Sequence, residues 1–120
     1  MFKAVEALAL RLPRVATATR YDGSPVLQVD GVFLAGLATH HSAEPDSLVI
    51  RAAPEHRAAM LAEAPETYYV TDYYRRHPVV LVRLPCVTPD ILSGLLSASW
   101  RIASAKTRAS RPKSARPARG

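Results

Sequence analysis

The chain has 120 residues, 48% of them hydrophobic, with 16 Lys and Arg against 10 Asp and Glu and a net charge of +6. This length suits one domain, and a single cysteine without clustered Cys and His excludes a disulfide framework and the usual zinc sites. No segment reaches the roughly 18 apolar residues of a membrane span, and charges interrupt the first twelve residues, so we expect a cytoplasmic protein without a signal peptide or membrane segment.

The first half of the chain predicts one helix followed by four short strands. Apolar residues recur every three or four positions from Phe2 to Leu12, which indicates an amphipathic helix that ends before Pro13. The dipeptide Asp30-Gly31 tolerates the positive φ angles of a tight turn and separates two β-rich runs, so it predicts a hairpin. Short connections make the strands antiparallel, and we place them at Val15–Tyr21, Val26–Val29, Val32–Leu37 and Leu48–Arg51.

A second helix and two further strands are expected before the last helix. Pro54 suits the first position of a helix and Pro65 ends the pattern, which predicts a helix over Pro54–Ala64. Aromatic and β-branched residues then predict strands over Tyr68–Thr71 and Val79–Leu84.

The last helix begins at Thr88-Pro89-Asp90, which combines an N-cap, a first-turn proline and a first-turn acid. The order of all these elements is not a strict alternation of strand and helix. We therefore expect an α+β fold, in which an antiparallel β-sheet carries helices packed on one face. The side of the last helix that faces the core is predicted to consist of Ile91, Leu92, Leu95, Leu96, Ser99, Trp100, Ile102 and Ala103.

The net charge arises at the C-terminal end. Of the 16 Lys and Arg, six lie in residues 104–120, which contain no acid, and the remaining ten equal the ten Asp and Glu. This end also lacks aromatic and large aliphatic residues, so burial cannot offset the entropy of ordering it. We predict a neutral domain over residues 1–103 and a disordered basic tail over residues 104–120, with cations at Lys106, Arg108, Arg111, Lys113, Arg116 and Arg119.

Three segments carry a family resemblance. They are the hairpin Val29–Ala35, the run Tyr69–Leu84 with its Thr-Asp-Tyr-Tyr-Arg-x-His-Pro motif, and the closing helix with Ser99-Trp100-Arg101. Together they resemble the MmcQ/YjbR family of small bacterial proteins, whose fold is CyaY-like, that is, frataxin-like. The resemblance extends from about Phe2 to Lys106 and is strongest in the second half of the chain.

The resemblance implies the α+β fold, a cytoplasmic location and DNA binding, and it transfers no catalytic residue. Many hairpins of the family place a basic residue directly after the glycine, where this chain has Val32, so one phosphate contact is missing. Frataxins use an acidic helix face for iron, and the first helix here offers only Glu6, so iron handling is not implied by the shared fold.

The strongest candidate for nucleic-acid contact is the segment rich in tyrosine and arginine before the last strand. Aromatic rings stack on bases and arginines bind phosphates, so the candidate residues are Tyr73, Tyr74, Arg75, Arg76 and His77. The six cations of the tail would add nonspecific phosphate affinity. In the alternative interpretation, alternate tyrosines pack on the sheet, the arginines are solvated loop charges and the tail serves solubility alone.

Motifs for other chemistry are missing from the sequence. Adjacent His40 and His41 point to opposite sides of an extended chain and have no acid or Cys at ligand spacing, so we expect no metal. Without a glycine-rich phosphate loop or a nucleophile elbow, we expect no cofactor and no enzymatic activity. Two functions remain: a DNA-binding protein whose hairpin and Tyr73–His77 loop dock on DNA, or a protein-interaction module with a protein partner and no direct DNA recognition.

Overall fold

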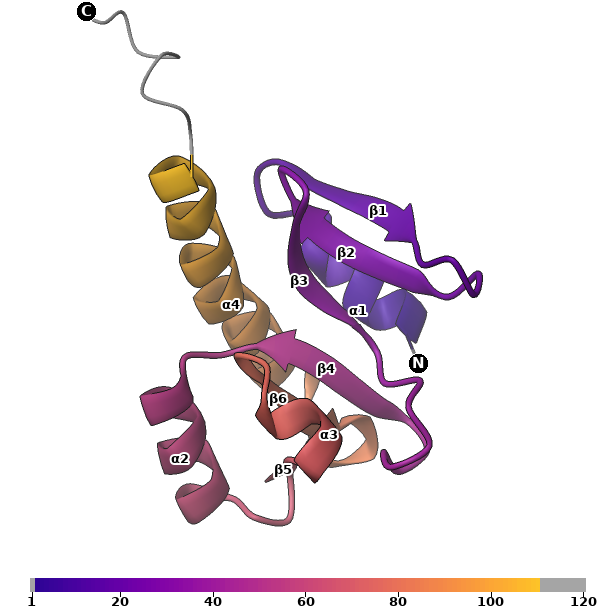
Figure 1. Cartoon of the computed structure of the whole chain (residues 1–120), viewed down its shortest axis with the longest axis vertical. Coiled ribbons are helices and arrows are strands. Elements are labelled where there is room, and N and C mark those ends of the chain that lie inside the picture. The colour runs from indigo at the N-terminus through magenta and orange to yellow at the C-terminus, as the bar shows by residue number, and fades with distance from the viewer. Residues whose placement is uncertain (1, 111–120) are drawn as a thin grey trace, which may run out of the picture.

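A computed structural model of the chain describes residues 2–110 (Figure 1). Four α-helices and six strands follow one another along this part of the chain, with a 3-10 turn, η1, before the last helix. In chain order they are α1 Phe2–Ala9, β1 Val15–Thr19, β2 Pro25–Val29, β3 Val32–Leu37, β4 Ser47–Arg51, α2 Pro54–Glu63, β5 Tyr68–Tyr69, α3 Asp72–Arg75, β6 Val79–Arg83, η1 Leu84–Cys86 and α4 Pro89–Ser110.

The strands form one antiparallel sheet in the order β1-β2-β3-β4-β6-β5. The predicted α+β class is therefore confirmed. The hairpin turn is also confirmed, because Asp30 and Gly31 both have positive φ angles, 49° and 85°, as a two-residue turn between twisted strands requires.

The helical face of the sheet holds the main core. Helices α1 and α4 pack together behind the strands (Figure 1), as the amphipathic patterns predict. Alternate strand residues point into this layer, so that β4 contributes Leu48 and Ile50 while β6 contributes Val80 and Val82. Helices α1, α2 and α4 add Val5, Ala9, Met60, Leu92, Leu96 and Ala103 to the cluster.

The opposite face, which we call the open face, carries a smaller cluster. Val49, Val79 and Leu81 point to this side between the residues of the main core, and Tyr74 from α3 packs on them. Helix α3 therefore covers part of the face that the sequence left without helices. The strand predicted over Tyr68–Thr71 ends at Tyr69, since Thr71 caps α3 by accepting a hydrogen bond from the Tyr74 N–H.

A β-bulge in β3 decides which residues reach the open face. Leu27 pairs with Ala35, but the next residue, Gln28, pairs with Phe33, so Leu34 is an extra residue in β3. Leu34 and Ala35 both lie in the main core, whereas Phe33 packs with the open-face cluster. The extra residue thus places Phe33 on the same face as Gly36, three positions further along.

Helix α4 corrects two expectations from the sequence. Ile91, predicted to face the core, is 47% exposed. Residues 104–110, assigned to the disordered tail, continue α4 instead, and Ser104 is buried. The remaining tail, residues 111–120, lies outside the described residues. None of the helices within residues 2–110 has both the length and the apolar character that crossing a membrane requires.

Candidate functional site

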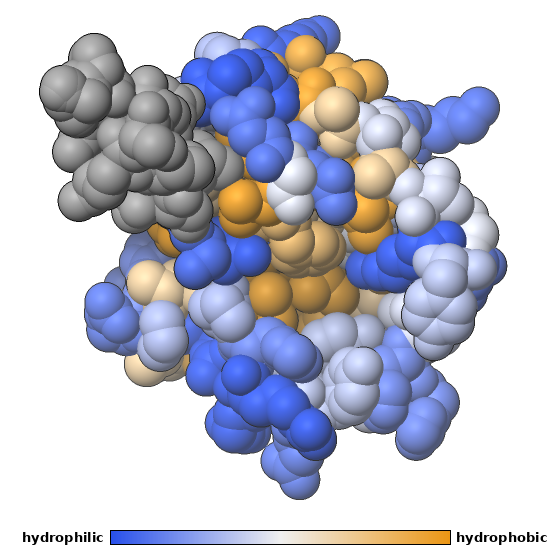
Figure 2. Space-filling model, turned by 45° about the horizontal axis from the view of Figure 1, so that its top comes forward, coloured by the Kyte–Doolittle hydropathy of each residue, from blue (hydrophilic) through white to orange (hydrophobic). Residues whose placement is uncertain are grey.

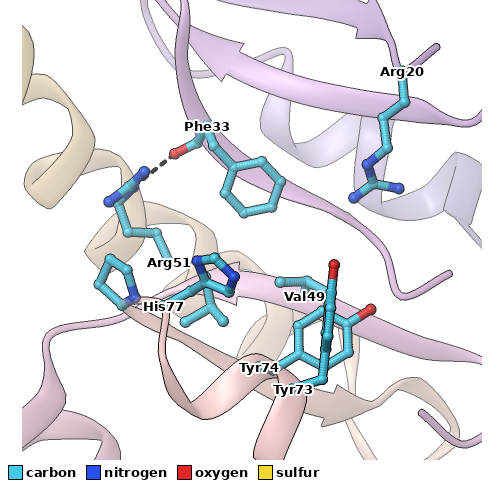
Figure 3. A pocket seen from close by; sticks show the side chains of 9 residues that line it. Arg20, Phe33, Val49, Arg51, Tyr73, Tyr74 and His77 are labelled. Carbon is cyan, nitrogen blue, oxygen red and sulfur yellow. Dashed lines mark hydrogen bonds between the residues drawn. The ribbon is translucent and has the colours of Figure 1, made fainter. Parts of the chain in front are cut away.

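A groove of about 250 Å³ opens on the open face (Figure 3). Its walls come from the end of β1, from β3 and β4, and from the segment between α3 and β6. The lining residues are Arg20, Phe33, Val49, Arg51, Tyr73, Tyr74, His77, Pro78 and Val79. No acidic residue is among them.

The floor of the groove is apolar. Val49 pairs with Gly36, and Val79 pairs with Arg51, so side chains from three strands meet there. Phe33 stands beside them, brought to this face by the bulge. Figure 2 shows apolar surface in a hollow at the middle of the molecule, framed by hydrophilic side chains.

Arg51 forms one end of the groove. Its Nε donates a hydrogen bond to the carbonyl oxygen of Phe33 at 2.7 Å, drawn as the dashed line in Figure 3. Its own carbonyl accepts a hydrogen bond from the Ser99 hydroxyl of α4 at 2.5 Å. Burial lowers the pKa of the Arg51 guanidinium below its ordinary value, so the side chain is partly desolvated and held by the backbone.

Arg20 forms the other end of the groove. Its Nη1 donates to the carbonyl of Leu37 at 2.9 Å and to the Ser24 hydroxyl at 3.0 Å. The guanidinium lies over Gly36, where a Cβ atom would come within 2.8 Å of Nη2. Because Gly36 has no side chain, the Arg20 guanidinium can lie directly against the sheet at this position.

Within the described residues, neither arginine has an ion-pair partner. Among the side chains that the structure describes, no carboxylate lies within 4.0 Å of Arg20, Arg51 or Arg76. Asp22 attracts Arg20 more weakly from a distance, and its pKa is lowered mainly by hydrogen bonds from Ser24. The groove is consequently a cationic site with an apolar floor.

Helix α3 supplies the aromatic wall. Tyr74 is buried, and its hydroxyl accepts a hydrogen bond from the His40 backbone N–H at 3.1 Å. Tyr73 is 40% exposed and stacks on the His40 ring, with centroids 3.6 Å apart. The Arg76 guanidinium lies 5.6 Å from the centre of the Tyr73 ring, within the range of a cation–π contact.

His40 is a neutral partner in this stack. Its pKa is lowered from 6.5, first by desolvation and then by the charges of His41 and Arg76. Its Nδ1 accepts a hydrogen bond from the Ser42 N–H, which fits an unprotonated nitrogen at that position. The aromatic wall is therefore uncharged at neutral pH.

Arg83 contrasts with the groove arginines. It forms two hydrogen bonds to the Glu44 carboxylate at 2.7 and 2.8 Å and lies over the Tyr69 ring at 4.3 Å. Its Nη1 also donates to the carbonyls of Pro65 and Glu66. The hydrogen bonds to Glu44 raise the pKa of Arg83, and the carboxylate neutralises its charge, so Arg83 holds the loops in place.

The residues of the predicted nucleic-acid segment, Tyr73–His77, have different roles in the structure. Tyr74 is a packing residue, as the alternative interpretation expected for alternate tyrosines. Tyr73 and His77 line the groove, and Arg75 and Arg76 are exposed beside it. The fold brings Arg20, Phe33, Arg51 and His40 to this segment, and of these Arg20 and His40 were not expected beside it from the sequence.

The tail cations are only partly described. Lys106 is exposed on α4, and Arg108 belongs to the same helix. Arg111, Lys113, Arg116 and Arg119 lie outside the described residues. Within the described part of the chain, no group of three His, Cys, Asp or Glu is placed to hold a metal ion.

Comparisons with protein-family models, with curated proteins and with solved structures found no match. The resemblance to the MmcQ/YjbR family accordingly remains a prediction from the quoted residues.

Proposed function

We propose that this domain binds DNA without catalysing a reaction, using the open face and α3 as the contact surface. The observation that carries the proposal is the gathering of Arg20, Arg51 and Arg76 around the exposed ring of Tyr73, with the exposed Arg75 next to Arg76 in the chain. Apart from a long 3.8 Å contact between Arg75 and Asp72, these cations have no ion pair in the described part of the chain. The family resemblance agrees with this proposal.

Each group has a role that its chemistry suits. Guanidinium groups make strong, charge-assisted hydrogen bonds to phosphate oxygens. Arg75 and Arg76 sit at the end of a short helix and reach outward, so they contact the backbone of the nucleic acid. Such contacts fix position and carry no sequence information directly.

The basic C-terminal residues add affinity of a second kind. Lys106 and Arg108 on α4, followed by four more cations in residues 111–120, attract any polyanion. Each neutralised phosphate steepens the dependence of affinity on salt by roughly 0.9 in a log–log plot. Substitutions in the tail and substitutions in α3 therefore show how much each segment contributes to the affinity and to its salt dependence.

The test measures binding of a fluorescent DNA duplex to the full chain as a function of salt. Replacing Arg75 and Arg76 with Ala should weaken binding at least about tenfold and flatten the salt slope by about 1.8. The matched control removes Arg11 and Arg101, two exposed arginines of the helical layer, and should change affinity by no more than about twofold. If both double variants bind equally, the contact surface is not the open face.

A second function, docking of a protein partner, is favoured by the apolar floor of the groove. An acidic peptide with an apolar side chain would complement Val49, Val79 and the two groove arginines. This alternative gains support if the full chain binds no DNA duplex, even at low salt where the tail cations act most strongly.

A further inference from the structure

We propose that the groove between Arg20 and Arg51 receives one unpaired nucleotide of a DNA single strand, its base against Phe33 and its phosphates on the two guanidiniums. This inference rests on the proposed function and adds to it the form of DNA that the site prefers.

The size of the groove matches a single flat ring. At about 250 Å³ it is smaller than the roughly 300–1,000 Å³ of pockets for drug-sized ligands. Its middle is apolar and partly aromatic, from Phe33, Val49 and Val79, while both guanidiniums lie at its ends (Figure 3). A base offers apolar ring faces, and within a strand the sugar that carries it is joined to a phosphate on either side, so this distribution of polarity fits a nucleotide of the strand.

The guanidiniums retain donors for the phosphates. An arginine side chain has five N–H donors. In the described structure Arg51 directs only its Nε to the protein, at Phe33, and Arg20 directs only its Nη1, at Leu37 and Ser24. The hydrogen bonds to backbone carbonyls fix both groups in advance, and therefore less side-chain entropy is lost when an anion binds.

An aromatic path continues beyond the groove. A second hollow of about 350 Å³ shares Arg20, Tyr73 and Tyr74 with it and is further lined by Tyr21, Asp22, Thr39 and His40. Tyr21 is fully exposed at the β1–β2 turn. Solvent-exposed aromatic rings along a cationic surface are the usual stacking platform for successive bases.

Single-stranded DNA suits this arrangement better than a duplex. In a duplex the faces of each base are stacked, and taking one base out costs unpairing and unstacking energy. Phe33 and the floor lie between the flanking guanidiniums, so only an unstacked base can reach them. A duplex can still contact Arg75 and Arg76 through its phosphates, which separates the two binding modes.

The test compares a fluorescent oligothymidylate with a duplex of equal length at about 200 mM salt, where phosphate contacts of the tail are weakened. The full chain should bind the single strand at least about tenfold more tightly. Phe33→Leu keeps an apolar side chain but removes the ring, and should weaken binding of the single strand about fivefold or more, a larger factor than its effect on binding of the duplex. Phe2→Leu, on the helical layer, is the matched control.

A measurement on the unmodified protein guards against variants that fold poorly. Titration with the oligothymidylate, followed by NMR of the histidine rings, should shift the signals of His77 and His40 and leave His56 on α2 unchanged. Equal shifts at all three rings, or equal losses for Phe33→Leu and Phe2→Leu, would overturn the proposal. So would saturation of the groove by thymidine monophosphate with no preference for the strand, since the site would then take a free nucleotide.

The outcomes distinguish this inference from the proposed function. If the duplex binds as tightly as the single strand and depends on Arg75 and Arg76, the DNA-binding function stands and the nucleotide groove is rejected. If neither form of DNA binds at about 200 mM salt, both proposals are rejected.

Discussion

The imidazole of His40 lies flat on the phenol ring of Tyr73, with 3.6 Å between the ring centroids and 8° between the planes. The contact joins the loop after β3 to α3, and the hydrogen bond from the His40 N–H to Tyr74 reinforces it. Arg76 lies on the same cluster, so its positive charge opposes protonation of His40.

The first prediction concerns this histidine. Desolvation, His41 and Arg76 hold the pKa of His40 below 6.5, so the ring should titrate at lower pH in the folded chain than in urea. The unfolded chain takes up the proton first, and therefore stability is lost as the pH falls below about 6.5. NMR titration of the ring measures this, and Arg76→Gln should raise the pKa by removing one repelling charge.

The second prediction contrasts two glycines. Gly31 has a φ angle of 85° in the hairpin turn, which an L-side chain adopts only with strain, so Gly31→Ala should cost about 1–2 kcal/mol. Gly94 lies inside α4 with open space around its Cα. Gly94→Ala should stabilise the protein by about 0.5–1 kcal/mol. Urea denaturation of both variants gives the comparison, and a hairpin insensitive to Gly31→Ala would contradict the turn geometry.

The elements predicted correctly are those with strong local signals. Asp30-Gly31 specifies a turn through its own backbone preferences, and Pro54 and Thr88 mark where helices begin. Helix α3 has only four residues, too few for a helical period, and only its cap at Thr71 could have indicated it. The last helix continues past residue 103 because no proline interrupts it before Pro112.

The groove could not be found in the sequence, because pairing between distant strands creates it. Arg20 and Arg51 are 31 positions apart in the sequence and meet Phe33 only through the register of β3 and its bulge. One extra residue reverses which side chains face the helices. The tyrosine and arginine cluster, by contrast, is contiguous, and therefore composition alone pointed to it.

The third prediction tests how α4 is fixed to the first half of the chain. Trp100 is half-buried against the main core, and its Nε1 donates a hydrogen bond to the Pro13 carbonyl at 2.8 Å. Because part of the ring stays exposed, Trp100→Ala should cost about 2–3 kcal/mol, below the values for fully buried tryptophans. Trp100→Phe retains most of the packing and should cost about 1 kcal/mol for the lost hydrogen bond. Losses under about 0.5 kcal/mol for both would contradict the contact.

The fourth prediction links α4 to the groove through a buried hydroxyl. Ser99 is 1% exposed and donates to the carbonyl of Arg51, so Ser99→Ala removes the bond that fixes the backbone beneath that arginine. The variant should lose about 1 kcal/mol of stability, measured by thermal or urea unfolding. Ser93→Ala is the matched control, since Ser93 is exposed on the same helix and alanine there should stabilise by a few tenths of a kcal/mol. Equal effects of the two substitutions would show that the Ser99 hydroxyl does not hold Arg51 in place.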